Sequence, residues 1–178
     1  RKKTTAVNAI WQIKKDYTGG ERNTDQFFTG LKGDSEVLFN YVYGLSTNMG
    51  ANTTKLETYV KVQGDGHFEI TLSDAGLCGT GAKIIVYDDS TNAVVEEFYV
   101  IIFGDVNGDS LVTGSDSSMV KAEVNNRDWS TGVTLVSYMF KAANINGDTI
   151  ITGSDSASIK AIVNNPQIVL SQKIGVVS

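Results

Sequence analysis

The sequence has little of several features that assign proteins to functional classes. It contains one cysteine, one histidine and one proline in 178 residues. With Cys78 alone no intramolecular disulfide can form, although this count does not decide between an intracellular and an extracellular protein. No apolar run approaches the ~18 residues that a membrane-spanning helix needs, so we expect no membrane insertion.

Clustered positive charge is also absent. The chain has 15 Lys and Arg against 20 Asp and Glu, a net charge of -5 and a pI near 4.8. No dense stripe of Lys and Arg is available to displace counterions from phosphates, so binding to nucleic acid is not expected. The N-terminus carries no signal peptide and begins at Arg1, which favours a fragment of a larger protein.

Residue patterns typical of catalysis are scarce. Cys78 lies in the glycine-rich stretch LCGTG, downstream of the only histidine, His67. A Cys–His catalytic pair is the minor interpretation because no orienting Asn or Asp pattern accompanies it, and a half-buried structural thiol is commoner. The acidic residues Asp65, Glu69 and Asp74 are scattered. We therefore expect no catalytic residues and no enzyme activity.

The first 103 residues show mainly β-strand patterns. Runs rich in β-branched and aromatic residues predict strands at 37–45, 67–72, 82–88 and 93–103, with a hairpin turn at 89–92. The stretch 52–62 predicts a short amphipathic helix, because Leu56, Tyr59 and Val60 follow helical spacing after a candidate N-cap at Asn52 or Thr53. Residues 1–31 do not separate a strand from a short helix. The sum is an α+β or β-rich domain over 1–103.

Four aromatic residues of this domain fall at strand spacing: Tyr41, Tyr43, Phe98 and Tyr99. Aromatic residues at this spacing are usually core residues or cross-strand pairs, which is the favoured interpretation. The alternative is a platform for stacking sugars. The chain would then be a calcium-stabilised carbohydrate-binding module with its sugar site in the first domain.

A twelve-residue run occurs twice in the second part of the chain. It reads DVNGDSLVTGSD at 105–116 and NINGDTIITGSD at 144–155. Oxygen-bearing side chains stand at positions one, three, five, nine and twelve of both runs, the spacing at which an EF-hand loop binds calcium. Two Asx-rich turns that bind nothing would explain each run separately but not their shared spacing. We therefore expect two Ca²⁺ sites.

The expected ligands are five side chains and the backbone carbonyl at position seven of each loop. They are Asp105, Asn107, Asp109, Leu111, Thr113 and Asp116 in the first loop, and Asn144, Asn146, Asp148, Ile150, Thr152 and Asp155 in the second. Three carboxylates in the first loop and two in the second predict that the second site is weaker. Position six is Ser110 and Thr149 where EF-hands use glycine, and a positive φ there would cost ~1 kcal/mol.

Each run is followed by a helix-forming segment, at 115–126 and 154–165. Across 105–126 and 144–165, 13 of 22 aligned residues are identical. A β-like segment precedes the first run, so each repeat is a loop plus one helix.

The segments around the repeats also carry expectations. Residues 132–143 predict a helix between the repeats, Pro166 ends the last helix, and 167–177 are expected to be extended and to fold back onto either domain. No Pro/Ser-rich linker separates residue 103 from 104, so we expect the two parts to pack together.

Two loop–helix repeats containing GDVNGD at 104–109 and AANINGD at 142–148 resemble the dockerin family. The resemblance covers 104–165 and implies an all-α calcium-binding dockerin with two loop-helix (F-hand) motifs over 104–178. The preceding domain resembles an Ig-like fold or an X module by its position. A dockerin implies calcium-dependent binding to a cohesin of a scaffoldin or cell-surface protein. The setting would be secreted: a cellulosome-like extracellular complex for polysaccharide degradation.

In dockerins, cohesin contacts come from loop positions ten and eleven and from the following helix. The corresponding residues are Gly114, Ser115, Lys121 and Ala122 in the first repeat, and Gly153, Ser154, Lys160 and Ala161 in the second. Gly-Ser departs from the hydroxyl pair of several type I dockerins, which leaves the cohesin type open. Because the two sets are identical, a rotation of 180° would present nearly the same surface, and the resemblance predicts a two-way binding mode.

Overall fold

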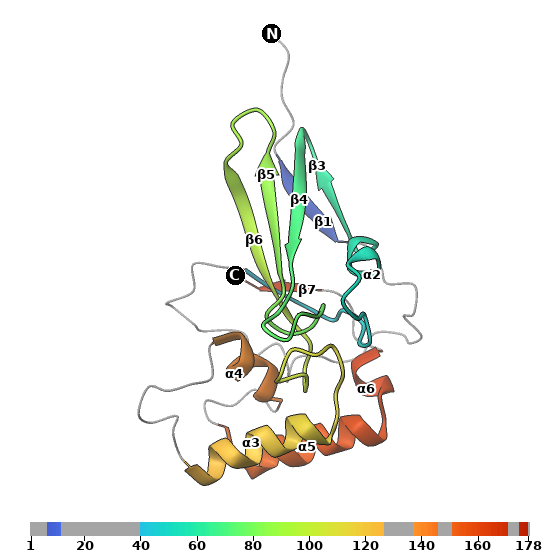
Figure 1. Cartoon of the computed structure of the whole chain (residues 1–178), viewed down its shortest axis with the longest axis vertical. Coiled ribbons are helices and arrows are strands. Elements are labelled where there is room, and N and C mark those ends of the chain that lie inside the picture. Colours follow the sequence, from blue (N-terminus) through green and yellow to red (C-terminus); the bar gives the residue numbers. More distant parts are fainter. Residues whose placement is uncertain (1–6, 12–39, 127–136, 146–150, 171–174, 178) are drawn as a thin grey trace.

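Strands occupy one end of the molecule and the two longest helices the other (Figure 1). The computed structural model describes residues 7–11, 40–126, 137–145, 151–170 and 175–177. Within these ranges no helix combines the length and the apolar character needed to cross a bilayer.

The main sheet has five strands in the order β4-β5-β6-β2-β7. They are β2 (Asn40–Tyr43), β4 (Gly66–Thr71), β5 (Lys83–Asp88), β6 (Val94–Ile101) and β7 (Gly175–Val177). Strands β2 and β6 run parallel, and the other neighbours are antiparallel. The predicted strands and the turn between β5 and β6 are therefore confirmed where they fall within the described residues.

A second sheet pairs β1 (Asn8–Trp11) with β3 (Val60–Gln63) in antiparallel register. It packs against the main sheet through Trp11, whose ring meets Phe98 edge-on at a centroid distance of 5.4 Å. The helix predicted over 52–62 is wrong beyond its first turn, because α2 spans only Thr54–Glu57. The residues after it alternate between the two faces of a strand and pair with a segment far away in sequence.

The other helices of the described residues lie in the second part of the chain: α3 (Gly114–Asn126), α4 (Ser137–Ala143), α5 (Gly153–Asn164) and α6 (Gln167–Leu170). The extended prediction for 167–177 is wrong at α6, which begins directly after Pro166; the amide of Val169 donates to the Pro166 carbonyl at 3.1 Å. Proline suits the start of a helix because its missing N–H would be unpaired there. Strand β7 does fold back, onto β2 in the first part of the chain.

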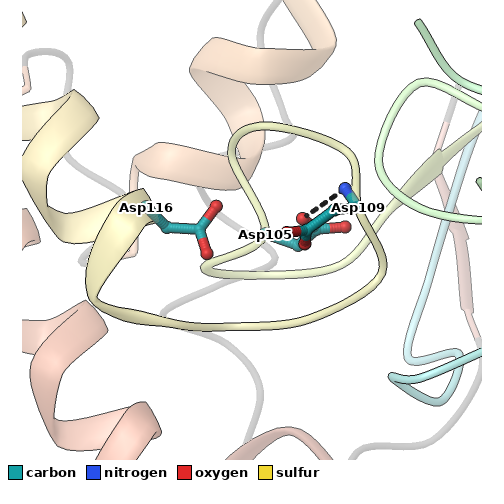
Figure 2. A group of neighbouring side chains, drawn as sticks. All are labelled: Asp105, Asp109 and Asp116. Carbon is teal, nitrogen blue, oxygen red and sulfur yellow. Dashed lines mark hydrogen bonds between the residues drawn. The ribbon is translucent and has the colours of Figure 1, made fainter. Parts of the chain in front are cut away.

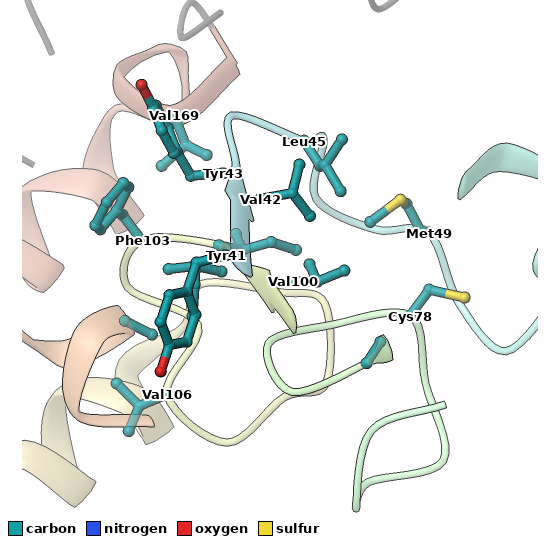
Figure 3. Close-up of a cluster of buried hydrophobic side chains, with 14 of the residues drawn as sticks. Tyr41, Val42, Tyr43, Leu45, Met49, Cys78, Val100, Phe103, Val106 and Val169 are labelled. Atoms are coloured by element: carbon teal, nitrogen blue, oxygen red, sulfur yellow. The ribbon is translucent and has the colours of Figure 1, made fainter. Parts of the chain in front are cut away.

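One hydrophobic core runs through both parts of the chain (Figure 3). Tyr41 and Phe103 from the first part pack in the same cluster as Val106 of the first repeat loop and Val169 of α6. The expected packing of the two parts is therefore observed, while the division at 103/104 stays a prediction.

Three of the four aromatic residues at strand spacing belong to this core. Tyr41, Tyr43 and Phe98 are only 1%, 7% and 2% exposed, so they cannot present their rings to a sugar. Tyr99 is half-buried and stacks on Tyr138 of α4. The sugar platform drawn from these four residues is therefore wrong, and the core interpretation holds.

Candidate metal centre and helix pair

The first repeat loop gathers three aspartates from separate positions in the sequence. One carboxylate oxygen each of Asp105, Asp109 and Asp116 lies within 4.8 Å of the other two. Figure 2 shows Asp116 reaching from the start of α3 toward the loop that carries Asp105 and Asp109. Asp105 and Asp116 are completely buried. This grouping is the one that the sequence spacing predicts.

Asp105 is held by four backbone amides. Its Oδ1 accepts from Gly108 and Asp109, both at 3.1 Å, and its Oδ2 accepts from Ser110 and Thr80, both at 3.0 Å. Burial raises the pKa of Asp105 to about 8, and the neighbouring aspartates add to this rise while the Thr80 and Ser110 amides oppose it. The carboxylate is therefore placed for a cation whose charge would offset the loss of water.

Asp116 serves both the loop and the helix. It accepts from Val106 and Asn107 with Oδ1, at 2.8 and 3.1 Å, and from Thr113 with Oδ2 at 2.9 Å. Burial raises its pKa as well. Asp116 lies in the first turn of α3. An ion bound by its carboxylate would therefore also stabilise the start of the helix.

The oxygen set of the first loop fits calcium. Within the described part of the chain, no Lys, Arg or His pairs with the three carboxylates, and buried charges otherwise need such a partner or a metal. Asn107 and Thr113 lie half-buried beside them. The Leu111 side chain is 40% exposed, which suits a position expected to contribute only its carbonyl. Hard cations prefer oxygen ligands of this kind.

Ser110 at position six has φ 71°, so the positive φ considered from the sequence is confirmed. Its side chain is completely buried. A residue with a Cβ atom is strained by ~1 kcal/mol at this φ. Other contacts of Ser110 must therefore compensate for the strain.

Only the ends of the second loop lie within the described residues; Asn146, Asp148, Thr149 and Ile150 fall outside them. Asn144 and Asp155 are buried, at 1% and 0% exposure. Thr152 caps α5 by accepting from the Ser154 amide at 3.2 Å, and its own amide donates to Asp155 at 2.9 Å. The matching bonds in the first repeat measure 3.3 and 2.9 Å. The two loops therefore end in the same geometry.

Helices α3 and α5 meet through equivalent residues. The hydroxyls of Ser117 and Ser156 lie 2.7 Å apart, and each donates to the other residue's carbonyl oxygen at 3.2 Å. Lys121 lies beside its counterpart Lys160 and lowers the pKa of that lysine. Reciprocal bonds of equal length are what a local two-fold axis between the repeats produces.

The residues that the resemblance assigns to partner binding are all exposed around this axis: Gly114, Ser115, Lys121 and Ala122 on α3, and Gly153, Ser154, Lys160 and Ala161 on α5. We call these eight residues the duplicated face. The structure leaves both copies open to solvent, although their role stays a prediction.

Cys78 and His67 do not form a catalytic pair. The Cys78 thiol is completely buried rather than half-buried, and burial raises its pKa. Its sulfur contacts the carbonyl of Asn52 at 3.9 Å. His67 lies on β4, where its Nδ1 is 2.6 Å from Oδ1 of Asp89. A buried thiol with a raised pKa is unreactive.

The sequence interpretation missed a contribution from the first domain. Thr80, whose amide donates to Asp105, lies in the same LCGTG stretch as Cys78. No sequence pattern marks a backbone amide that serves a carboxylate 25 positions away.

Comparison with known proteins adds one match. Residues 103–164 match the family described as the dockerin type I domain. No curated protein matches the chain, and no solved structure does.

Proposed function

Residues 103–164 are a type I dockerin domain, and we propose that this chain anchors its parent protein in a cellulosome-like extracellular complex or on the cell surface. Dockerin domains bind cohesin modules and require calcium to do so. The partner we propose is a cohesin of a scaffoldin or of a cell-surface protein. The protein carrying the chain would then be secreted.

The observation that carries the proposal is the duplicated face. Its two copies consist of identical residue types on α3 and α5, and the Ser117–Ser156 contact relates the two helices by reciprocal hydrogen bonds. Apart from its two lysines, the face consists of the small residues glycine, serine and alanine. Such a surface suits docking against another folded protein better than enclosure of a small ligand.

Two calcium ions are part of the proposal. The first would be held by Asp105, Asn107, Asp109, Asp116, Thr113 and the Leu111 carbonyl, and the second by Asn144, Asn146, Asp148, Thr152, Asp155 and the Ile150 carbonyl. Bound calcium supplies positive charge that offsets the repulsion among buried carboxylates. Asp116 and Asp155 also accept from the amides of Thr113 and Thr152, so the loops and the docking helices become ordered together.

Binding of the full chain to a panel of type I and type II cohesins, with calcium and with a chelator, tests the proposal. We expect at least one cohesin to bind in calcium, to dissociate when EGTA is added, and to bind again when calcium is restored. Circular dichroism in both conditions reports whether helices are lost together with binding.

The panel also separates the alternatives. If no cohesin binds a chain that is folded and calcium-loaded, the proposed function is wrong. If a cohesin binds equally well in EGTA, the role assigned to calcium is wrong.

A further inference from the structure

The first repeat loop is held from outside by two loops of the first domain. The amides of Asn48 and Met49 donate to the carbonyl and hydroxyl oxygens of Ser110, at 2.5 and 2.9 Å. The Ser73 hydroxyl donates to the carbonyl of Gly108 at 2.7 Å. We call residues 46–50 and 73–81 the clasp.

The clasp lies so close to the loop that side chains would not fit between them. A Cβ placed on Gly79 would overlap the carbonyl of Gly108 and lie 2.5 Å from the amide nitrogen of Ser110. A Cβ on Gly108 would lie 2.6 Å from the carbonyl oxygen of Thr80. These neighbours are backbone atoms, so they can move only if the loop or the clasp moves as a whole.

The contacts of the clasp depend on the closed shape of the loop. Ser110 reaches Asn48 and Met49 from a backbone with φ 71°, and its own amide donates to Asp105 at 3.0 Å. The same Asp105 oxygen accepts from Thr80 of the clasp. The conformation that gathers the carboxylates is therefore the conformation that the clasp recognises.

We propose that the clasp is part of the first calcium site: it raises the calcium affinity of loop 105–116, and calcium in turn fixes the clasp. Coupling between two binding events is reciprocal. Without calcium, repulsion among buried carboxylates favours an opened loop, which loses its bonds to residues 48, 49 and 73. The inference rests on the proposed binding of calcium by this loop.

Calcium titration calorimetry on the full chain tests the coupling, with one site removed at a time. The Asp148→Ala background leaves the first site, and the Asp109→Ala background leaves the second. In the first background we expect Gly79→Ala to weaken calcium binding about tenfold, within the usual range of coupling between sites. In the second background the same substitution is expected to change the affinity by less than about twofold.

Gly76→Ala is the matched control. Gly76 lies in the clasp but has no atom within 4 Å of an added Cβ, and its φ of +74° makes alanine strained there. Gly76→Ala is therefore expected to destabilise the first domain without a steric clash against the loop 105–116. A second pair of variants replaces this test if Gly79→Ala does not fold. Ser73→Ala removes a hydroxyl that bonds the clasp to the loop, and its control, Ser90→Ala, removes a hydroxyl from the exposed turn after Asp88.

Amide hydrogen exchange measures the reverse direction. On passing from calcium to EGTA, the Asn48 and Met49 amides are expected to exchange at least about tenfold faster. The amide of Val86, which is buried on β5 between two neighbouring strands, is expected to change less. If both clasp variants and their controls bind calcium alike, or if the Asn48 and Met49 amides keep their protection in EGTA, the inference is overturned. Failure of cohesin binding with the coupling intact would overturn only the proposed docking function.

Discussion

The helices of the two repeats meet each other, whereas the first loop meets a different part of the chain. Ser117 and Ser156 exchange equivalent bonds across the local axis, and the residues of the duplicated face are exposed on both sides of it. Ser110 and Gly108 instead contact the clasp. The duplication of the sequence is therefore visible in the contact between the two helices and in the surface they present, while the first loop contacts residues that precede both repeats.

The largest expected effect tests the duplicated face. In two-way binding, Ser115→Gln with Lys121→Glu removes one orientation, so cohesin affinity should fall only about twofold. Adding Ser154→Gln and Lys160→Glu should remove the other and reduce affinity at least ~100-fold. Surface plasmon resonance on the cohesin identified by the panel measures both.

The control for this experiment is Lys61→Glu, an exposed charge reversal on β3, which should leave affinity unchanged. If Ser115→Gln with Lys121→Glu alone abolishes binding while the second repeat is intact, the two-way mode is wrong.

The next effect concerns position six of the first loop. Ser110→Ala keeps the positive φ but leaves the buried Met49 amide without its acceptor, which should lower the free energy of unfolding by ~2 kcal/mol. Ser110→Gly loses the same acceptor but relieves the backbone strain, so it should recover ~1 kcal/mol. Urea unfolding in excess calcium measures both variants. A glycine variant less stable than the alanine variant would contradict this division between strain and hydrogen bonding.

The repeats were predictable because their signals are local. Oxygen ligands at fixed spacing, and the Thr and Asp residues that begin each helix, act within a few residues of one another, and α3 and α5 lie within one residue of their predicted bounds. The β5–β6 hairpin is local in the same way, since Asp88 orders its own turn by accepting from Ser90 at 2.8 Å. Sequence patterns that act over so few residues predict the same local structure whatever the rest of the fold.

The failures lie where distant partners decide the structure. Val60 fits both the helical spacing that begins at Leu56 and the alternation of a strand. Pairing of Val60 with Trp11 of β1, some fifty positions earlier in the sequence, selects the strand. Proline predicts the end of one helix at Pro166, but the next helix begins directly after it, with the Pro166 carbonyl accepting from the Val169 amide. The clasp could not be predicted from the sequence either. It contacts the loop mainly through backbone amides such as that of Thr80, and no side-chain pattern encodes such a contact.

A smaller effect ranks the two calcium sites. Asn144 stands where the first loop has Asp105, so Asn144→Asp should tighten the second site about tenfold, which is ~1.4 kcal/mol of binding free energy. Calorimetry on the full chain should show two unequal sites in the parent and a smaller gap in the variant. Asn164→Asp on the exposed end of α5 is the control for added charge alone. Equal affinities in the parent chain would overturn the ranking.

The smallest effect examines the local axis itself. Ser117→Ala and Ser156→Ala each remove one hydroxyl from a reciprocal pair but leave the other able to donate to a carbonyl. Each should therefore cost ~1 kcal/mol of unfolding free energy, and the two costs should agree within ~0.5 kcal/mol. The double variant should cost less than the sum, because both single variants lose the same hydroxyl–hydroxyl contact. Urea unfolding in excess calcium gives all three values, and unequal single costs would mean that the two-fold relation seen in the hydrogen bonds does not extend to their energies.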